Sequence, residues 1–117
     1  MGKPHEKLDA WRISMDLAKA VYDLTAKFPG EERYGLSQQM RRAAVSIPSN
    51  IAEGSGRNHV KEYLQFIGIA RGSLAELETQ LKLAVMLKFV PDNHEAFELA
   101  DSAGRLLTGL HKKWSVM

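Results

Sequence analysis

The sequence predicts an all-α protein, an antiparallel up-down-up-down four-helix bundle that forms a single domain over residues 1–117. Turn-forming residues occur at Phe28-Pro29-Gly30, Gly54-Ser55-Gly56 and Pro91-Asp92-Asn93, and they separate four segments of about 20 to 30 residues. Each segment repeats apolar residues at helical spacing, and none alternates apolar and polar residues as a strand would. We therefore expect helices over about residues 8–28, 36–57, 60–89 and 93–115, joined by the short connections typical of such bundles.

The segment over residues 8–28 has charged side chains on one narrow side and apolar side chains over the rest. The charged side consists of Asp9, Arg12, Asp16, Lys19, Asp23 and Lys27. The apolar arc is about 200° wide, whereas a helix that faces a single core needs about 100°. The excess predicts that this helix is buried twice, in its own bundle and against another subunit, with Trp11 as a candidate contact residue.

The segment over residues 36–57 has a narrow apolar stripe with a proline in its middle. The stripe consists of Leu36, Met40, Ala43, Ala44, Ile47 and Ile51. Pro48 removes one backbone hydrogen bond and should bend the helix. Because the stripe continues past Pro48 without a change of phase, we expect a kinked but continuous helix and not a break into two.

The third segment, over residues 60–89, carries small residues along one side: Gly68, Gly72, Ala75 and Thr79. Glycine inside a helix lowers helix stability by only about 1 kcal/mol relative to alanine, so a helix can contain glycines that have no specific role. Two of them in line with Ala75 instead favour close packing against another helix. The fourth segment, over residues 93–115, begins with Asp92 and Glu95 at the spacing of a capping box.

The composition and the missing motifs argue against catalysis. The chain has no cysteine, which excludes disulfides, thiol chemistry and cysteine-based zinc sites. No H-E-x-x-H, no P-loop and no Glu-x-x-His pattern is present. We therefore expect no enzymatic activity, no metal and no cofactor. No apolar stretch is long enough for a membrane span, and the N-terminus lacks the apolar region of a signal peptide, so we expect a cytoplasmic protein.

Basic residues concentrate in the second segment and just after it. Arg41, Arg42, Arg57 and Lys61 are our candidates for contacts with nucleic acid, because guanidinium and ammonium groups bind phosphate well. Glu53 is expected to form an ion pair with Arg57 four residues later. Aromatic residues make up only 8% of the chain, so contacts are expected with the nucleic-acid backbone and not by base stacking.

Three blocks of sequence resemble one family. They read QMRRAAVSIPSNIAEGSGR over residues 39–57, FPGEERYGL over residues 28–36 and IARGSLAELETQL over residues 69–81. The chain resembles the four helix bundle proteins, also called the 23S rRNA intervening-sequence proteins, over nearly its whole length. The signature positions are Arg41, Arg42, Ser46, Asn50, Glu53, Gly54, Arg57, Gly72, Ser73 and Glu76.

The resemblance implies a four-helix bundle that assembles into a ring of five. It also implies a likeness to the accessory variability proteins of diversity-generating retroelements, which present a basic surface and work with a reverse transcriptase and nucleic acid. Two functional hypotheses follow. The first is a homo-oligomer that binds nucleic acid, with structured RNA favoured over DNA. The alternative is a protein-interaction scaffold or accessory subunit without nucleic-acid contact, in which the arginines pair with acids of a neighbour.

Overall fold

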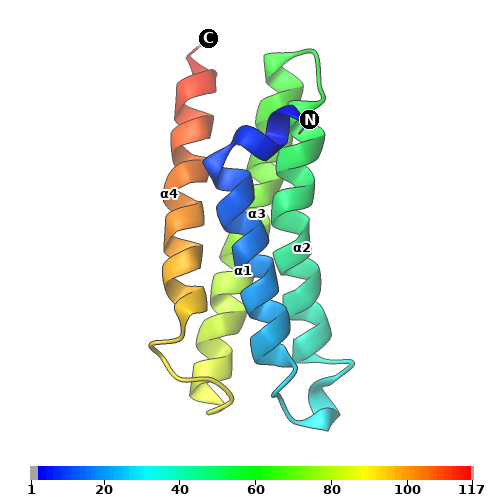
Figure 1. The fold of residues 1–117 in the computed structure, drawn as a ribbon, viewed down its shortest axis with the longest axis vertical. Helices are drawn as coiled ribbons and strands as arrows, with labels where there is room; N and C mark the ends of the chain where they lie inside the picture. Colours follow the sequence, from blue (N-terminus) through cyan, green and yellow to red (C-terminus); the bar gives the residue numbers. More distant parts are fainter. Residues whose placement is uncertain (1–2, 117) are drawn as a thin grey trace.

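The computed structural model describes residues 3–116 and contains four long helices (Figure 1). These are α1 (Asp9–Thr25), α2 (Leu36–Ser55), α3 (Val60–Met86) and α4 (Glu95–Ser115). Two short 3₁₀ turns, η1 (Pro4–Lys7) and η2 (Gly30–Glu32), were not expected from the sequence. Residues 3–116 contain no strand, so the predicted all-α class is confirmed.

The four helices enclose one elongated core. Each helix packs against the next in the sequence, and α4 packs back against α1. The described part of the molecule measures 45 × 25 × 22 Å, and Figure 1 shows both ends of the chain at the same end of the bundle. All four helices contribute fully buried side chains, the largest of which are Leu17, Met40, Ile47, Ile51, Ile67, Leu77, Leu81 and Leu107. Their helical spacing explains why periodicity alone predicted the number of helices.

Helix α2 runs through Pro48 without interruption, as the unbroken apolar stripe indicated. Pro48 is buried, together with Ala44 and Ile47 on the preceding turn and Ile51 on the next. Packing on this face can offset the backbone hydrogen bond that the proline removes. The bend at Pro48 stays a prediction.

Three helix ends were predicted too late, at residues 28, 57 and 89, whereas the helices end at residues 25, 55 and 86. The apolar or charged side chains that follow these ends still fit the helical spacing. The end of α3 shows the physical reason. Lys88 has a left-handed backbone with φ of 65°, and the N–H groups of Lys88 and Phe89 donate to the carbonyls of Val85 and Ala84. This hydrogen-bond pattern closes a helix end and usually has glycine in the left-handed position.

The predicted capping box at the start of the fourth helix was wrong. Helix α4 begins at Glu95, two residues later than expected, and its N-cap is His94 and not Asp92. The His94 Nδ1 atom accepts the Ala96 N–H at 3.0 Å. An imidazole nitrogen thus takes the place of the carboxylate that the sequence suggested.

Gly54 lies in the last turn of α2, close to α3 and just before the loop between the two helices. A Cβ atom at this position would lie 3.0 Å from Phe66 Cβ and 3.4 Å from the Tyr63 carbonyl oxygen. The structure therefore accounts for a glycine at this signature position. We expect Gly54→Ala to reduce the free energy of unfolding, measured by urea denaturation, by about 1–3 kcal/mol because the two helices must move apart.

Gly56→Ala is the matched control for this prediction. A Cβ atom there would lie at an ordinary 3.6 Å from the Glu53 carbonyl oxygen, and the backbone has φ of −88°, so little change is expected. Equal losses of stability in the two variants would contradict the close approach at Gly54.

Candidate nucleic-acid interface

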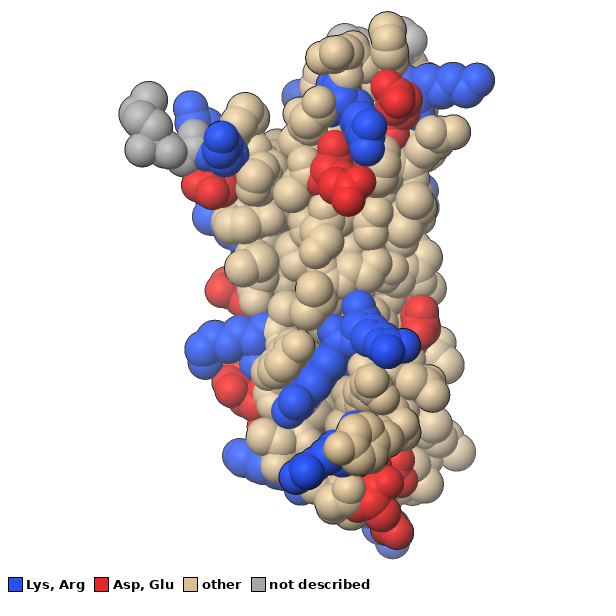
Figure 2. Space-filling view, turned by 90° about the vertical axis from the view of Figure 1, so that its right-hand side faces the viewer, with Lys and Arg blue, Asp and Glu red and all other residues tan. Residues whose placement is uncertain are grey.

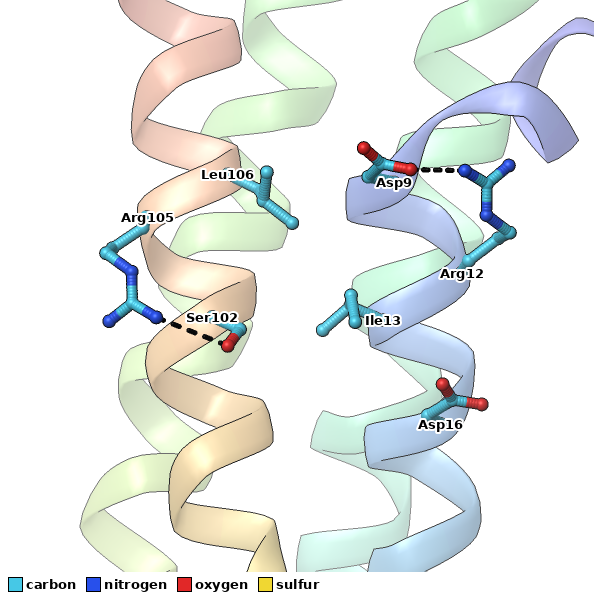
Figure 3. Close-up of a pocket in the computed structure, with 7 residues that line it drawn as sticks. All are labelled: Asp9, Arg12, Ile13, Asp16, Ser102, Arg105 and Leu106. Carbon is cyan, nitrogen blue, oxygen red and sulfur yellow. Dashed lines mark hydrogen bonds and ion pairs between the residues drawn. The ribbon is translucent and has the colours of Figure 1, made fainter.

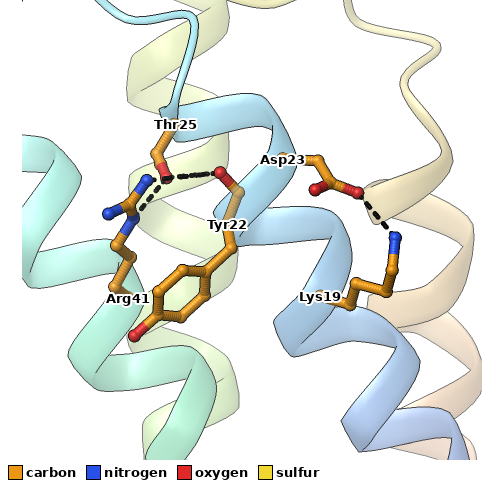
Figure 4. Close-up of polar contacts among 5 residues, drawn as sticks. All are labelled: Lys19, Tyr22, Asp23, Thr25 and Arg41. Carbon is orange, nitrogen blue, oxygen red and sulfur yellow. Dashed lines mark hydrogen bonds and ion pairs between the residues drawn. The ribbon is translucent and has the colours of Figure 1, made fainter.

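Arg41 is held in place by helix α1. Its Nε donates to Thr25 Oγ1 at 2.8 Å, its Nη2 donates to the Tyr22 carbonyl oxygen at 3.3 Å, and its guanidinium carbon lies 4.5 Å from the centre of the Tyr22 ring (Figure 4). Thr25 Oγ1 in turn donates to the Val21 carbonyl at 2.7 Å. The half-buried Arg41 side chain therefore connects α1 to α2 and is fixed in direction, which the sequence did not predict.

An open cleft of about 520 Å³ lies beside Arg41 and carries only basic charge. It is lined by Tyr22, Arg33, Tyr34, Gln38, Arg41, Arg42, Val45 and Ser46. We call this group of residues the basic cleft. Figure 2 shows Lys and Arg side chains gathered over the lower half of the face on which α2 lies. Arg42 is exposed and forms no hydrogen bond or ion pair within residues 3–116, so its charge is available to a ligand.

Two tyrosines of the basic cleft were missed as binding candidates. Tyr34 is 83% exposed, and Tyr22 is almost half exposed although Arg41 covers one face of its ring. Exposed aromatic rings beside arginines can stack on unpaired bases. The low aromatic content of the whole chain did not indicate that two tyrosines lie together in the basic cleft. The block FPGEERYGL, in which Tyr34 follows Arg33, is the sequence feature that could have indicated Tyr34 as a binding residue.

Arg57 and Lys61 do not belong to the basic cleft. Arg57 follows the end of α2, whereas Arg42 lies thirteen positions before that end, which corresponds to about 20 Å along the helix axis. Arg57 pairs with Glu53 at 3.5 Å, as predicted, and lies 4.7 Å from the Phe66 ring. Lys61 is exposed in the first turn of α3. In Figure 2 the basic side chains near the upper end alternate with acidic ones, and a band of uncharged surface separates them from the lower group.

Three other signature residues connect α2 to α3. Ser46 Oγ and Ser73 Oγ are 2.8 Å apart, and Asn50 Nδ2 donates to the carbonyl oxygen of Ser46 at 2.8 Å and to its Oγ at 3.0 Å. Glu76 is exposed and accepts a hydrogen bond from Gln80 Nε2 at 3.1 Å. The polar residues that are unusual in the middle of a helix thus form a partly buried contact between the helices.

The small residues on α3 face outward. Gly68, Gly72, Ala75 and Thr79 are all exposed, and a Cβ atom added to either glycine would meet no atom within 4 Å. No helix within residues 3–116 approaches this side of α3. Trp11, the other candidate for subunit contact, is half-buried against the core, and its ring lies 5.1 Å from the His5 ring.

A second cleft, of about 510 Å³, lies between α1 and α4 and has mixed charge (Figure 3). Arg12 pairs with Asp9, and Arg105 donates to Ser102 Oγ at 3.3 Å. Asp16 adds a second acid to the lining. Because the charges of opposite sign largely offset each other, this cleft is a poorer site for a polyanion than the basic cleft.

Titratable groups with shifted pKa values lie outside both clefts. Burial raises the pKa of Glu78, the nearby charge of Asp101 raises it further, and Lys82 opposes the shift. Burial also raises the pKa of Tyr63. Among the described residues no three His, Asp or Glu side chains are placed to hold a metal ion. None of the helices in this part of the chain has the length and apolar character needed to span a bilayer.

Comparison with known families identifies a match over most of the chain. The family model described as 23S rRNA-intervening sequence protein matches residues 6–109. The matched range contains all three blocks quoted above and extends from η1 into α4. A comparison with curated proteins found no match.

Proposed function

The chain belongs to the family of 23S rRNA-intervening sequence proteins, and from this premise we propose that it is a non-enzymatic homo-oligomer that binds structured RNA through the basic cleft. The observation that carries the proposal is the cleft itself, where Arg33, Arg41 and Arg42 converge without an acidic side chain in the lining. Arginine is suited to phosphate because its planar fork can donate two hydrogen bonds to one group.

The geometry also supports a division of roles within the cleft. Arg41 is oriented by Thr25 and Tyr22, whereas Arg42 is free to follow the ligand. Tyr34 offers an exposed ring on which an unpaired base of an RNA loop can stack. Arg57 and Lys61 form a separate and weaker candidate site, because Glu53 offsets the charge of Arg57.

The oligomer of this proposal is a ring of five subunits in the cytoplasm. The outward stripe of Gly68, Gly72, Ala75 and Thr79 supports subunit contacts, since nothing in residues 3–116 covers it. Identical subunits placed around an axis would multiply the basic surface and strengthen binding to a polyanion. The proposal takes the bundle as antiparallel with up-down-up-down order, which the packing of consecutive helices and their short connections support.

We expect Arg42→Glu to weaken binding of a labelled RNA hairpin at least about tenfold at low salt, because it replaces an attractive charge by a repulsive one. Fluorescence anisotropy measured between about 50 and 200 mM salt checks this, and the wild type should lose affinity steeply with salt. Arg105→Glu makes the same charge change in the mixed cleft, where Arg105 contacts Ser102, and should bind nearly as the wild type does.

An equal loss of RNA affinity in Arg42→Glu and Arg105→Glu would mean that only the net charge of the protein matters. Such a result would contradict binding at a defined site. Absence of RNA binding at low salt, in a protein that still self-associates, would favour the alternative of a protein-interaction scaffold. The observation that favours this alternative is the same open stripe on α3.

A further inference from the structure

A small hollow lies next to the basic cleft, where the end of α1, the η2 turn and the start of α2 meet. It has a volume of about 180 Å³, and its lining includes Thr25, Gly30, Arg33, Ser37 and Arg41. Both arginines carry positive charge, and no acidic side chain belongs to the lining. The hollow is thus large enough for a small anion, and its charge would attract one.

Arg41 lines the hollow and has guanidinium N–H donors that are not used by its existing hydrogen bonds. A guanidinium group has five N–H donors, and Arg41 uses one on Thr25 Oγ1 and one on the Tyr22 carbonyl. No further partner for its N–H groups occurs among residues 3–116. Since the two existing bonds and the Tyr22 ring already fix its orientation, binding an anion would cost little additional side-chain entropy.

Ser37 supplies the second and independent indication of a ligand. The residue is only 6% exposed, its side chain lines the hollow, and its hydroxyl forms no hydrogen bond within the described residues. The Ser37 Oγ atom is not fully enclosed by protein, unlike the unpartnered Ser14 Oγ and Gln80 Oε1 atoms, so a ligand in the hollow can reach it. An anion in the hollow would accept this hydroxyl proton.

Backbone N–H groups add to the site. Ser37 belongs to the first turn of α2, a helix of 20 residues, and the N–H groups of Ser37 and Gln38 have no acceptor within residues 3–116. The carboxylate of Glu32 accepts the neighbouring Leu36 N–H at 3.2 Å, so that donor is already occupied. Free N–H groups at the positive end of a helix favour a negatively charged ligand.

We propose that this hollow binds one phosphate group, held by Arg41, the Ser37 hydroxyl and the first free N–H groups of α2, with Arg33 at the rim. A phosphate group offers several acceptor oxygens, which suits a site that combines a guanidinium fork, a hydroxyl and free helix N–H groups. The inference deepens the proposed function, and it rests on that function only for the statement that the phosphate is part of RNA.

NMR titration of the ¹⁵N-labelled full chain with inorganic phosphate, against sodium chloride at matched ionic strength, tests the site. We expect saturable shifts of the Ser37 and Gln38 amide signals with phosphate and none with chloride. Ser37→Ala should weaken phosphate binding about threefold to tenfold, and Arg41→Gln should abolish saturation. Ser102→Ala, in the mixed cleft, is the matched control and should leave phosphate binding unchanged.

Equal shifts with chloride, or unchanged phosphate binding in Ser37→Ala, would overturn the proposal and leave Arg41 with only a structural role. Since Arg41→Gln also removes the contact between α1 and α2, the Ser37→Ala result decides the test if that variant unfolds.

The source of the phosphate is decided with RNA hairpins that carry or lack a 5′-phosphate. Shifts of the Ser37 amide signal with both hairpins identify a backbone phosphate, and shifts with only the phosphorylated hairpin identify a terminal one. If neither hairpin shifts this signal while inorganic phosphate does, the site takes a free phosphate. In that case the phosphate site stands, and the anisotropy measurements decide the proposed RNA function separately.

Discussion

Ile47→Ala is expected to reduce the free energy of unfolding by about 2–5 kcal/mol, a large part of the stability of a domain of this size. Ile47 is completely buried in the centre of α2, next to Pro48 and between the buried residues Ala44 and Ile51. The truncation removes apolar contacts and leaves a cavity that a helix constrained by Pro48 cannot easily close. Urea denaturation monitored by circular dichroism measures the loss.

Val45→Ala is the matched control for the core of α2. Val45 lies two positions earlier on the same helix, where it is 42% exposed, so the change removes few buried contacts. Alanine also has a higher helix propensity than valine, so we expect an effect within about 0.5 kcal/mol of zero. If Val45→Ala cost as much as Ile47→Ala, the face of α2 that points into the bundle would have been assigned wrongly.

Gly72→Glu is expected to convert the proposed oligomer into monomers without unfolding the bundle. Within its own chain Gly72 is exposed and has free space around it, so a glutamate side chain should fit and should even favour the helix. In a closely packed subunit interface the same side chain would bring both steric overlap and buried charge. The proposed ring of five predicts about 65 kDa for the wild type, because each chain has a mass of 13.1 kDa, and a single-chain mass for the variant.

Light scattering coupled to size-exclusion chromatography, at several protein concentrations, gives these masses. Gly109→Glu is the matched control, because Gly109 is also an exposed helical glycine with no atom within 4 Å of an added Cβ, but it lies on α4. The control should keep the mass of the wild type. A monomeric wild type at all concentrations would refute the oligomer, and dissociation of both variants would place the interface elsewhere.

The two proposed surfaces can be separated by these variants. Arg42→Glu should reduce RNA binding and leave the mass unchanged, whereas Gly72→Glu should reduce the mass and weaken RNA binding only through the loss of multiple sites. If monomeric Gly72→Glu keeps a folded bundle and binds RNA weakly, the basic cleft remains the contact surface of each subunit.

Much of this fold could be predicted from the sequence because the relevant information is local. A buried stripe repeats every three to four residues, and turns need proline, glycine or similar residues, so the number of helices and the continuity of α2 through Pro48 followed from neighbouring residues. The three sequence blocks likewise indicated the family before any contact between helices was known. Helix ends were less predictable, because the left-handed backbone at Lys88 and the cap by His94 depend on how the chain leaves or enters the helix.

Only the tertiary structure decided what the basic residues do. Arg41 and Arg42 are adjacent in the sequence, yet Thr25 and Tyr22 of another helix hold the first, while the second remains free. Arg57 looked like a member of the same cluster, but it follows the far end of α2, about 20 Å along the helix axis from Arg42, and Glu53 offsets its charge. A long side chain takes its direction from neighbours that are distant in the sequence, and for that reason the basic cleft and the adjoining hollow proposed to bind phosphate appear only when the helices are packed together.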